Sequence, residues 1–150
     1  MTVKKKPKQE GVYYTDEIAA EICGEIATSS RGIRSLCKDN KATWPSPKTI
    51  FQWLKDKEDF RKKYWAAKEQ QADFLVDELL EIADDESGDR IFSAAGDTAN
   101  TAKVQRDRLR IDTRKFIAKV LLPKRYGDPK TIELLELKEE MQTWMEVNKK

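Results

Sequence analysis

The side chains best suited to bind a ligand lie in the stretch SPKTIFQWL, which begins at Ser46. Ser46 is a natural N-cap and Pro47 favours a first helical turn, so a helix is predicted to begin here. Helical spacing would turn Ile50, Trp53 and Leu54 towards a core. The opposite face then carries Lys48, Thr49, Gln52 and Lys55, with Phe51 at its margin. Such residues bind phosphates and base edges, although the same face is also typical of a merely solvated helix.

Several other kinds of chemistry are excluded by the sequence. The 150 residues include no His, so a catalytic His or a His-ligated zinc is ruled out. No GxGxxG or GxxxxGK[ST] loop is present to cradle phosphates. Asp84, Asp85 and Glu86 are adjacent, and a helix would point their carboxylates apart rather than towards one metal ion. We therefore expect no enzymatic activity, no metal and no cofactor.

The net charge and the cysteine content of the chain do not identify a partner. The chain has 29 Lys and Arg against 27 Asp and Glu, so only the distribution of charge is informative. Cys23 and Cys37 lie on apolar faces of predicted helices and are interpreted as buried thiols of a protein in a reducing cytoplasm. No apolar run is long enough to span a bilayer and no secretory leader is visible, so a membrane is not an expected partner.

Two short helices are predicted ahead of the helix at Ser46. The first follows the N-cap Thr15 and ends near residues 28–30, and the second begins around Gly32. The apolar stripe of the first helix is formed by Ile18, Ala19, Ile22, Cys23 and Ile26, and that of the second by Ile33, Leu36 and Cys37. Arg34 and Lys38 would face outward. Three short helices, the last with a polar face, are the arrangement of a helix-turn-helix unit, here with a long turn.

The first eleven residues are interpreted as a disordered basic arm. Lys4, Lys5 and Lys6 could contact phosphate, or could simply keep the chain soluble.

A long helix is predicted from about Lys57 to Asp85, since no Gly or Pro interrupts it. The apolar residues of its second half occupy more than one face; they are Phe74, Leu75, Val76, Leu79, Leu80, Ile82 and Ala83. A helix that is apolar on more than one face is buried on more than one side. Because so small a chain can hardly cover both sides, we infer a neighbouring subunit.

The charge pattern predicts that a second long helix folds back on the first. Residues 73–89 contain eight acidic and no basic residues, whereas residues 103–125 contain nine basic and two acidic ones. A helix over about 98–122 could therefore pack antiparallel, with acid and base meeting within or between subunits. Residues 86–100 are predicted to form a loop with a helical turn.

The C-terminal tail follows the turn KRYGDPK. It places Leu134, Leu137, Met141 and Trp144 at helical spacing, which makes a candidate contact surface for another subunit or a partner protein. The piece TIELLEL could equally be a strand by its composition.

Taken together, these stretches resemble the small subunit of bacteriophage terminases. The matching pieces are SPKTIFQWLKDKEDFRKKYWAAKEQQAD, LLEIADD and RLRIDTRKFIAKVLLPKRYGD, of which the last is the most specific, and the resemblance covers roughly residues 12–132. It implies a mainly α, non-enzymatic protein that forms a ring of many subunits in the host cell cytoplasm. Such a ring recognises the packaging site on double-stranded viral DNA. It recruits and regulates the terminase large subunit, which carries the ATPase and the nuclease.

The resemblance also implies a domain plan. Residues 1–11 would be the basic arm, 12–56 a helix-turn-helix DNA-binding domain and 57–125 a helical-hairpin oligomerisation domain. Residues 126–150 would form a C-terminal crown on the ring or contact the large subunit. In such proteins this segment contributes short strands, so residues 130–135 are expected as a strand and the rest as helix. The loop at 86–100 looks longer than in related proteins.

Two sets of residues are assigned on this plan. The expected DNA-binding residues are Lys4, Lys5, Lys6, Arg34, Lys38, Lys48, Thr49, Gln52, Lys55 and Lys63. The expected oligomer interface is formed by Phe74, Leu75, Val76, Leu79, Leu80, Ile82, Leu109, Arg114, Phe116 and Val120.

Two alternative functions use the same elements. A dimeric helix-turn-helix transcriptional regulator would show two-fold assembly and a pocket for a small ligand. A purely structural coiled-coil adaptor would need sustained heptads, which the break near residues 86–100 interrupts. The two-sided apolar face at 74–83 favours a ring, because each subunit of a ring contacts a neighbour on each flank.

Overall fold

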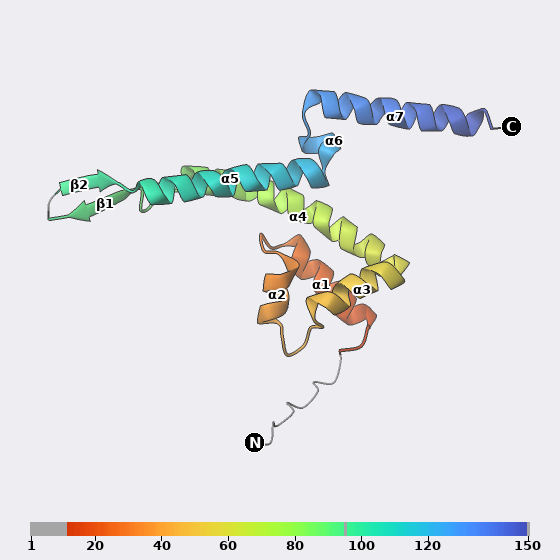
Figure 1. The fold of residues 1–150 in the computed structure, drawn as a ribbon, viewed down its shortest axis with the longest axis horizontal. Helices are drawn as coiled ribbons and strands as arrows, with labels where there is room; N and C mark the ends of the chain where they lie inside the picture. Colours follow the sequence, from red (N-terminus) through yellow and green to blue (C-terminus); the bar gives the residue numbers. More distant parts are fainter. Residues whose placement is uncertain (1–11, 95, 150) are drawn as a thin grey trace, which may run out of the picture. The chain divides into compact units, whose positions relative to one another are not determined.

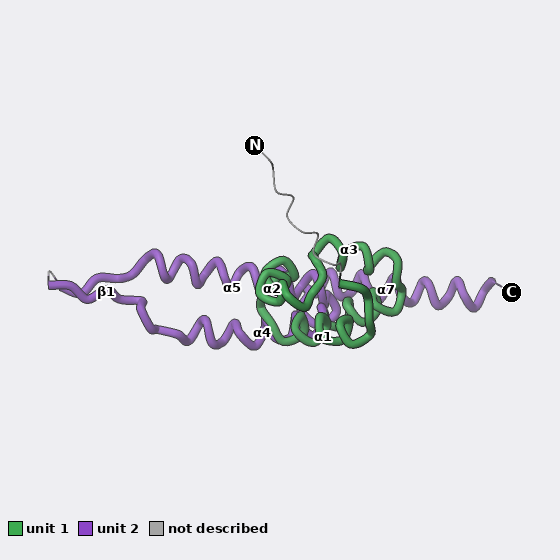
Figure 2. Tube along the Cα trace, turned by 90° about the horizontal axis from the view of Figure 1, so that it is seen from below, with its two compact units in different colours: residues 1–67 green, residues 68–150 purple. Residues whose placement is uncertain are grey.

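The computed structural model describes residues 12–94 and 96–149, and these are mainly helical, as expected (Figure 1). In chain order the helices are α1 (Asp16–Ala27), α2 (Ile33–Asp39), α3 (Pro47–Asp56), α4 (Glu58–Asp84), α5 (Thr101–Leu121), α6 (Pro123–Tyr126) and α7 (Pro129–Val147). Strands β1 (Arg90–Ser93) and β2 (Gly96–Ala99) lie between α4 and α5. The chain divides into two compact units, residues 1–67 and 68–150 (Figure 2).

The short helices of the first unit begin at the predicted caps. The Thr15 hydroxyl accepts a hydrogen bond from the Ile18 amide at 3.2 Å, and the Ser46 hydroxyl accepts one from the Thr49 amide at 3.2 Å. Each bond satisfies one of the amide groups that a helix leaves unpaired in its first turn. Pro47 occupies the start of α3, where its missing amide proton costs nothing.

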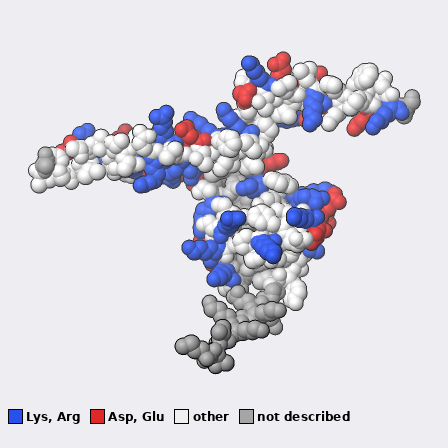
Figure 3. All heavy atoms as spheres, in the orientation of Figure 1, with Lys and Arg blue, Asp and Glu red and all other residues white. Residues whose placement is uncertain are grey.

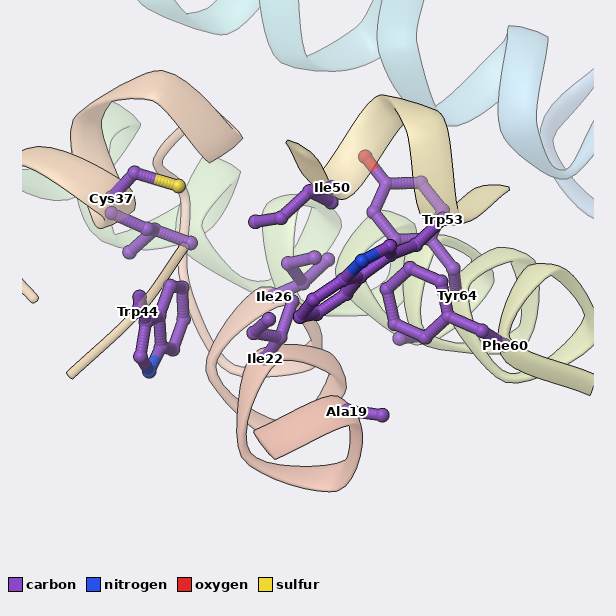
Figure 4. Close-up of a cluster of buried hydrophobic side chains, with 11 residues drawn as sticks. Ala19, Ile22, Ile26, Cys37, Trp44, Ile50, Trp53, Phe60 and Tyr64 are labelled. Carbon is purple, nitrogen blue, oxygen red and sulfur yellow. The ribbon is translucent and has the colours of Figure 1, made fainter. Parts of the chain in front are cut away.

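The core of the first unit draws on all four of its helices (Figure 4). Ile22, Ile26, Ile50 and Phe60 are its largest fully buried side chains. Phe60 packs edge-on against Trp53, with ring centroids 6.0 Å apart, so the start of α4 is fixed onto α3. Between α2 and α3, the buried Trp44 donates a hydrogen bond from Nε1 to Glu21 Oε1 of α1 at 2.8 Å. The loop between α2 and α3 is thereby tied to α1.

In the second unit, three contacts in reverse chain order show that α4 and α5 run antiparallel. Lys103 Nζ lies 3.4 Å from a carboxylate oxygen of Asp85, and Arg114 Nε donates to Glu78 Oε2 at 2.8 Å. Beyond α5, Arg125 donates to Asp73. The predicted pairing of the acidic and basic segments therefore occurs within the chain. Lys103 also contacts Asp89 and Asp107.

The ion pair between Asp73 and Arg125 predicts that the stability of the second unit falls at acid pH. Hydrogen bonds from Arg125, at 2.6 and 2.7 Å, and from the Tyr126 hydroxyl, at 2.7 Å, hold the pKa of Asp73 below its ordinary value. A lowered folded-state pKa stabilises the fold above the ordinary carboxyl pKa of about 4, and this stabilisation is lost as the pH falls through the lower value. Because the pair is largely exposed, Asp73→Asn should lower the unfolding temperature at neutral pH by only roughly 2–4 °C.

Thermal unfolding followed by circular dichroism between pH 7 and pH 3 tests this prediction. The wild-type chain should lose stability as the pH falls below about 4, and Asp73→Asn should lose less. The matched control is Asp77→Asn, which changes an exposed aspartate one turn further along α4. Equal acid dependence in Asp73→Asn and the wild type would contradict the assignment.

Residues 90–93 and 96–99 pair as a β-hairpin, so the helical turn expected within 86–100 was wrong. Ile91 pairs with Thr98 and Phe92 with Asp97 in an antiparallel register, and Arg90 lies 2.6 Å from Asp97. The Asn100 side chain donates to the Gly88 carbonyl at 2.9 Å and closes the base. The strand-forming run Arg-Ile-Phe-Ser and the positive φ of Gly96 (121°) favour this hairpin over a helical turn.

The tail corrects another expectation, because residues 130–135 are helical and do not form a strand. They belong to the first turns of α7, which is capped by Asp128: its carboxylate accepts from the Thr131 amide at 3.1 Å. Leu, Glu and Lys dominate the segment, and all are good helix formers once a cap is present. Within the part of the chain described, no helix is both long and apolar enough to cross a membrane.

Candidate nucleic-acid interface

The surface of α2 and α3 is rich in basic residues. Residues 31–57 contain seven Lys and Arg and only two Asp, whereas α1 carries four acidic residues and no basic one. Several Lys and Arg side chains are visible on one face of the first unit in Figure 3. A local excess of positive charge of this kind attracts a polyanion even though the whole chain is nearly neutral.

A first groove lies between α2 and the start of α3. Its basic wall is formed by Arg34, Lys38 and Lys41, and its other residues are Cys37, Trp44, Pro45, Ser46 and Pro47; its volume is about 330 Å³. Arg34 and Lys38 are one helical turn apart and fully on the exposed side of α2. The N-terminus of α3, whose amide dipoles favour anions, opens at the same place. The groove therefore combines three cations and a helix N-terminus, which together suit a phosphate.

A second groove, of about 480 Å³, follows the exposed face of α3. It is lined by Lys48, Thr49, Gln52, Trp53, Asp56 and Lys57. The Gln52 amide donates to both carboxylate oxygens of Asp56, at 3.0 and 3.1 Å, so a base edge would have to displace Asp56. The Thr49 hydroxyl shares a 3.0 Å hydrogen bond with Ser46 and helps to cap α3. Lys48 is exposed and close to the first groove in sequence.

The remaining predicted residues lie outside these two grooves. Lys55 is exposed near the end of α3. Lys63, on α4, lies 3.7 Å from Asp16 and lines neither groove. Lys4, Lys5 and Lys6 lie outside the described residues.

Two basic residues of the grooves were missed by the sequence analysis. Lys41 comes three residues after Lys38, so it lies on the same side as Arg34 and Lys38. It was missed because it lies in a stretch interpreted only as a turn. Lys57 lines the second groove, and its Nζ lies 4.3 Å from the centroid of the Tyr14 ring. The regular spacing of residues 34, 38 and 41 could have revealed Lys41.

The two thiols are embedded in the core, as expected. Cys37 is buried and Cys23 is half-buried, and burial raises the pKa of each thiol. A protonated, shielded thiol is a poor nucleophile. We therefore assign both cysteines a packing role in the first unit.

The expected interface residues of the second unit fall into two groups. Leu75 and Ile82 are buried within the unit, and Arg114 is held by Glu78. By contrast, Leu80, Leu109, Phe116 and Val120 are exposed, and Phe74, Val76 and Leu79 are half-buried. Leu109, Phe116 and Val120 fall on one face of α5, which we call the outer stripe, on the side away from Arg114 and Ala118. The outer stripe is an apolar surface that the hairpin leaves open.

The fold defines a class of mainly helical proteins in which a helix-turn-helix unit with a basic surface precedes a long antiparallel hairpin. The chain belongs to the Bacteriophage Sf6, terminase small subunit-like family, whose model matches residues 14–133. Membership of this family, which is generally non-catalytic, and the fold together support a role connected with packaging of a viral genome. The terminase small subunit expected from the resemblance is thereby confirmed.

Solved structures of a relative agree with the family. The chain is similar to the terminase small subunit gp1 of the bacterial virus Sf6, in three structures that each carry a single substitution. Sequence identity is 34% in one and 35% in the other two. Each match covers 78% of this chain and 79% of the other, with a TM-score of 0.62. A comparison with curated proteins gave no match.

Proposed function

We propose that this chain is a terminase small subunit that assembles into a homo-oligomeric ring and recognises the packaging site on double-stranded viral DNA. The ring recruits and regulates the terminase large subunit in the host cell cytoplasm and has no catalytic activity of its own. The observation that carries the DNA-binding part is the pair of basic grooves on α2 and α3, in a chain of this family. Residues 12–56 bind DNA in this proposal, and residues 57–125 assemble the ring.

Binding to DNA would begin at the phosphates. Arg34, Lys38 and Lys41 can each neutralise a phosphate, and the positive end of the α3 dipole, next to the same groove, favours one. Lys48 extends this contact along α3, and Lys55, Lys63 and the basic arm would add further phosphate contacts. Thr49 and Gln52 are the residues on α3 able to contact base edges. Because Gln52 is engaged by Asp56, each subunit contributes mainly electrostatic affinity, and the ring supplies avidity.

Assembly would bury the apolar residues that the hairpin leaves exposed. Leu80 on α4 and the outer stripe on α5 contact solvent in the single chain, and large exposed apolar surfaces mark interaction sites. Two such surfaces on one hairpin allow each subunit to meet a neighbour on either side, which is the head-to-tail contact of a closed ring.

The double variant Arg34→Ala/Lys48→Ala is expected to weaken DNA binding and to reduce its dependence on salt. Each lost phosphate contact should lower the slope of log affinity against log salt by about 0.9. Fluorescence anisotropy with labelled duplex DNA at several salt concentrations measures both quantities, and light scattering checks that assembly is unchanged. Lys62→Ala is the matched control, because Lys62 pairs with Glu58 on α4 and lies outside both grooves.

An unchanged affinity and salt slope in the double variant would overturn the assignment of the grooves to DNA. The family relationship does not depend on that result.

A further inference from the structure

Helix α7 presents an apolar face to solvent. None of its residues, all of which the structure describes, is buried. Leu134, Met141 and Trp144 are 67%, 65% and 68% exposed, and Leu137 is also exposed. Single exposed apolar residues are common on protein surfaces, but a row of large apolar side chains along one helix marks an interaction surface. We call these four residues the α7 seam.

The spacing of the α7 seam is that of a coiled coil. Its members follow one another at intervals of three, four and three residues, which places Leu134 and Met141 at a positions and Leu137 and Trp144 at d positions of a heptad. Met145, at the following e position, is exposed and widens the apolar face. A face wider than a strict a/d seam, with a bulky Trp at d, suits a bundle of more than two helices.

The rest of the unit contacts a different side of α7. Lys124, in α6, forms a salt bridge with Glu139. Glu139 is five residues beyond Leu134, and at about 100° per residue it lies on the side of the helix away from the seam. The salt bridge therefore leaves the seam open.

The charges beside the seam distinguish between two ways of pairing identical helices. Glu133 lies at a g position on one flank, and Lys138 lies at an e position on the other. In parallel helices a g residue meets the e residue five positions further along its neighbour, so Glu133 would meet Lys138 of the partner subunit. In antiparallel helices g residues face g residues, which would bring Glu133 and Glu140 of the two copies together. Charge complementarity therefore selects the parallel arrangement.

We propose that α7 self-associates with its copies in neighbouring subunits as a parallel, in-register helical bundle through the α7 seam. The proposal rests on the ring proposed above, since rotational symmetry carries every α7 in the same direction. The family match ends at residue 133, so the seam lies beyond it and belongs to this chain's own C-terminal segment. The bundle takes the place of the strand-built crown that the resemblance led us to expect.

Disulfide trapping of the full chain tests the bundle. The double variant Glu133→Cys/Lys138→Cys should give a ladder of covalent multimers on mild oxidation, and each single variant should give little. Glu136→Cys/Thr143→Cys is the control on the outward side of α7 and should give no ladder. Adding Met141→Asp to the first double variant should abolish its ladder, because a charge would enter the seam. The wild type measures any background from Cys23 and Cys37, and native mass is measured for every variant by light scattering.

The outcomes separate this proposal from the ring itself. A ladder confined to the double variant, and lost with Met141→Asp, supports the parallel bundle. A native mass of many subunits without a ladder overturns the bundle and leaves the ring standing. Covalent dimers that form as readily in a single variant as in the double variant also overturn it, because a disulfide between two copies of one position is not the Glu133–Lys138 pairing of a parallel, in-register bundle. A monomeric mass without a ladder overturns both the bundle and the ring.

Discussion

Replacing Phe116 by Asp is expected to convert the assembled protein to monomers while the helical hairpin stays folded. Phe116 is 67% exposed in the single chain and lies at the middle of the outer stripe of α5. The change therefore removes little packing within the chain. In the assembly it would bury a charge in an apolar contact, which costs several kcal/mol and weakens each subunit contact by about 100-fold or more.

Light scattering on a sizing column measures the native mass, and far-UV circular dichroism measures the helix content. Phe116→Leu is the matched control, because it keeps an apolar side chain at the same place and should retain the wild-type mass. A Phe116→Asp protein that migrates with the wild-type mass would exclude the outer stripe from the subunit contact. A wild-type protein that is itself monomeric would remove the ring proposal, and a dimer would favour the transcriptional regulator.

Replacing Phe60 by Ala is expected to unfold the first unit and so abolish DNA binding. Phe60 is fully buried, with ring centroids 5.9 Å from Tyr14, 6.0 Å from Trp53 and 6.1 Å from Tyr64. Removal of a buried Phe side chain costs about 3–5 kcal/mol. A unit this small is stable by only on the order of 5 kcal/mol, so the loss removes most or all of its stability.

Two measurements detect the unfolding of the first unit. Tryptophan fluorescence should shift to longer wavelength as the buried Trp44 and Trp53 become exposed to water, and duplex DNA binding should disappear. Much of the far-UV helix signal should persist, because the contacts of α4 with α5 and α6 in the second unit do not involve Phe60.

Trp65→Ala is the matched control for this variant. It removes a larger aromatic side chain from the same helix, but one that is 52% exposed and packs edge-on against Tyr64, with ring centroids 5.7 Å apart, so its effect should be about 0.5–1.5 kcal/mol, well below that of Phe60→Ala. Equal unfolding temperatures for Phe60→Ala and Trp65→Ala would contradict the position of Phe60 in the core.

The elements of this protein could largely be predicted from local signals. Thr15 and Ser46 act as N-caps, and the apolar spacing of α1 to α3 predicted which side of each helix is buried. The absence of Gly and Pro predicted a long helix at 57–85, and the structure places α4 at Glu58–Asp84. These features depend on residues within one or two helical turns of each other. Such residues are close together in the sequence, so the pattern can be recognised without the structure.

The sequence also determined that α4 and α5 pair, because eight acidic residues precede a strongly basic segment. It did not determine which residues meet. Only the tertiary structure showed that Leu75 and Ile82 are buried within the chain whereas Phe116 and Val120 remain exposed. Periodicity identifies an apolar face, but the partner of that face is chosen by packing between residues far apart in the sequence.

Three further features became clear only in the structure. The structure places Lys41 in one groove with Arg34 and Lys38, and the loop that carries it is tied to α1 by the hydrogen bond from Trp44 to Glu21, 23 residues away. Residues 90–93 and 96–99 form a hairpin through cross-strand pairing, which neither strand encodes alone. Residues 130–135 could be strand or helix by composition, and the Asp128 cap and the turns that follow it make them helix. The sequence by itself therefore determined where most of the helices lie and how charge is distributed, and the tertiary structure decided which faces stay open, because burial depends on contacts that no local pattern contains.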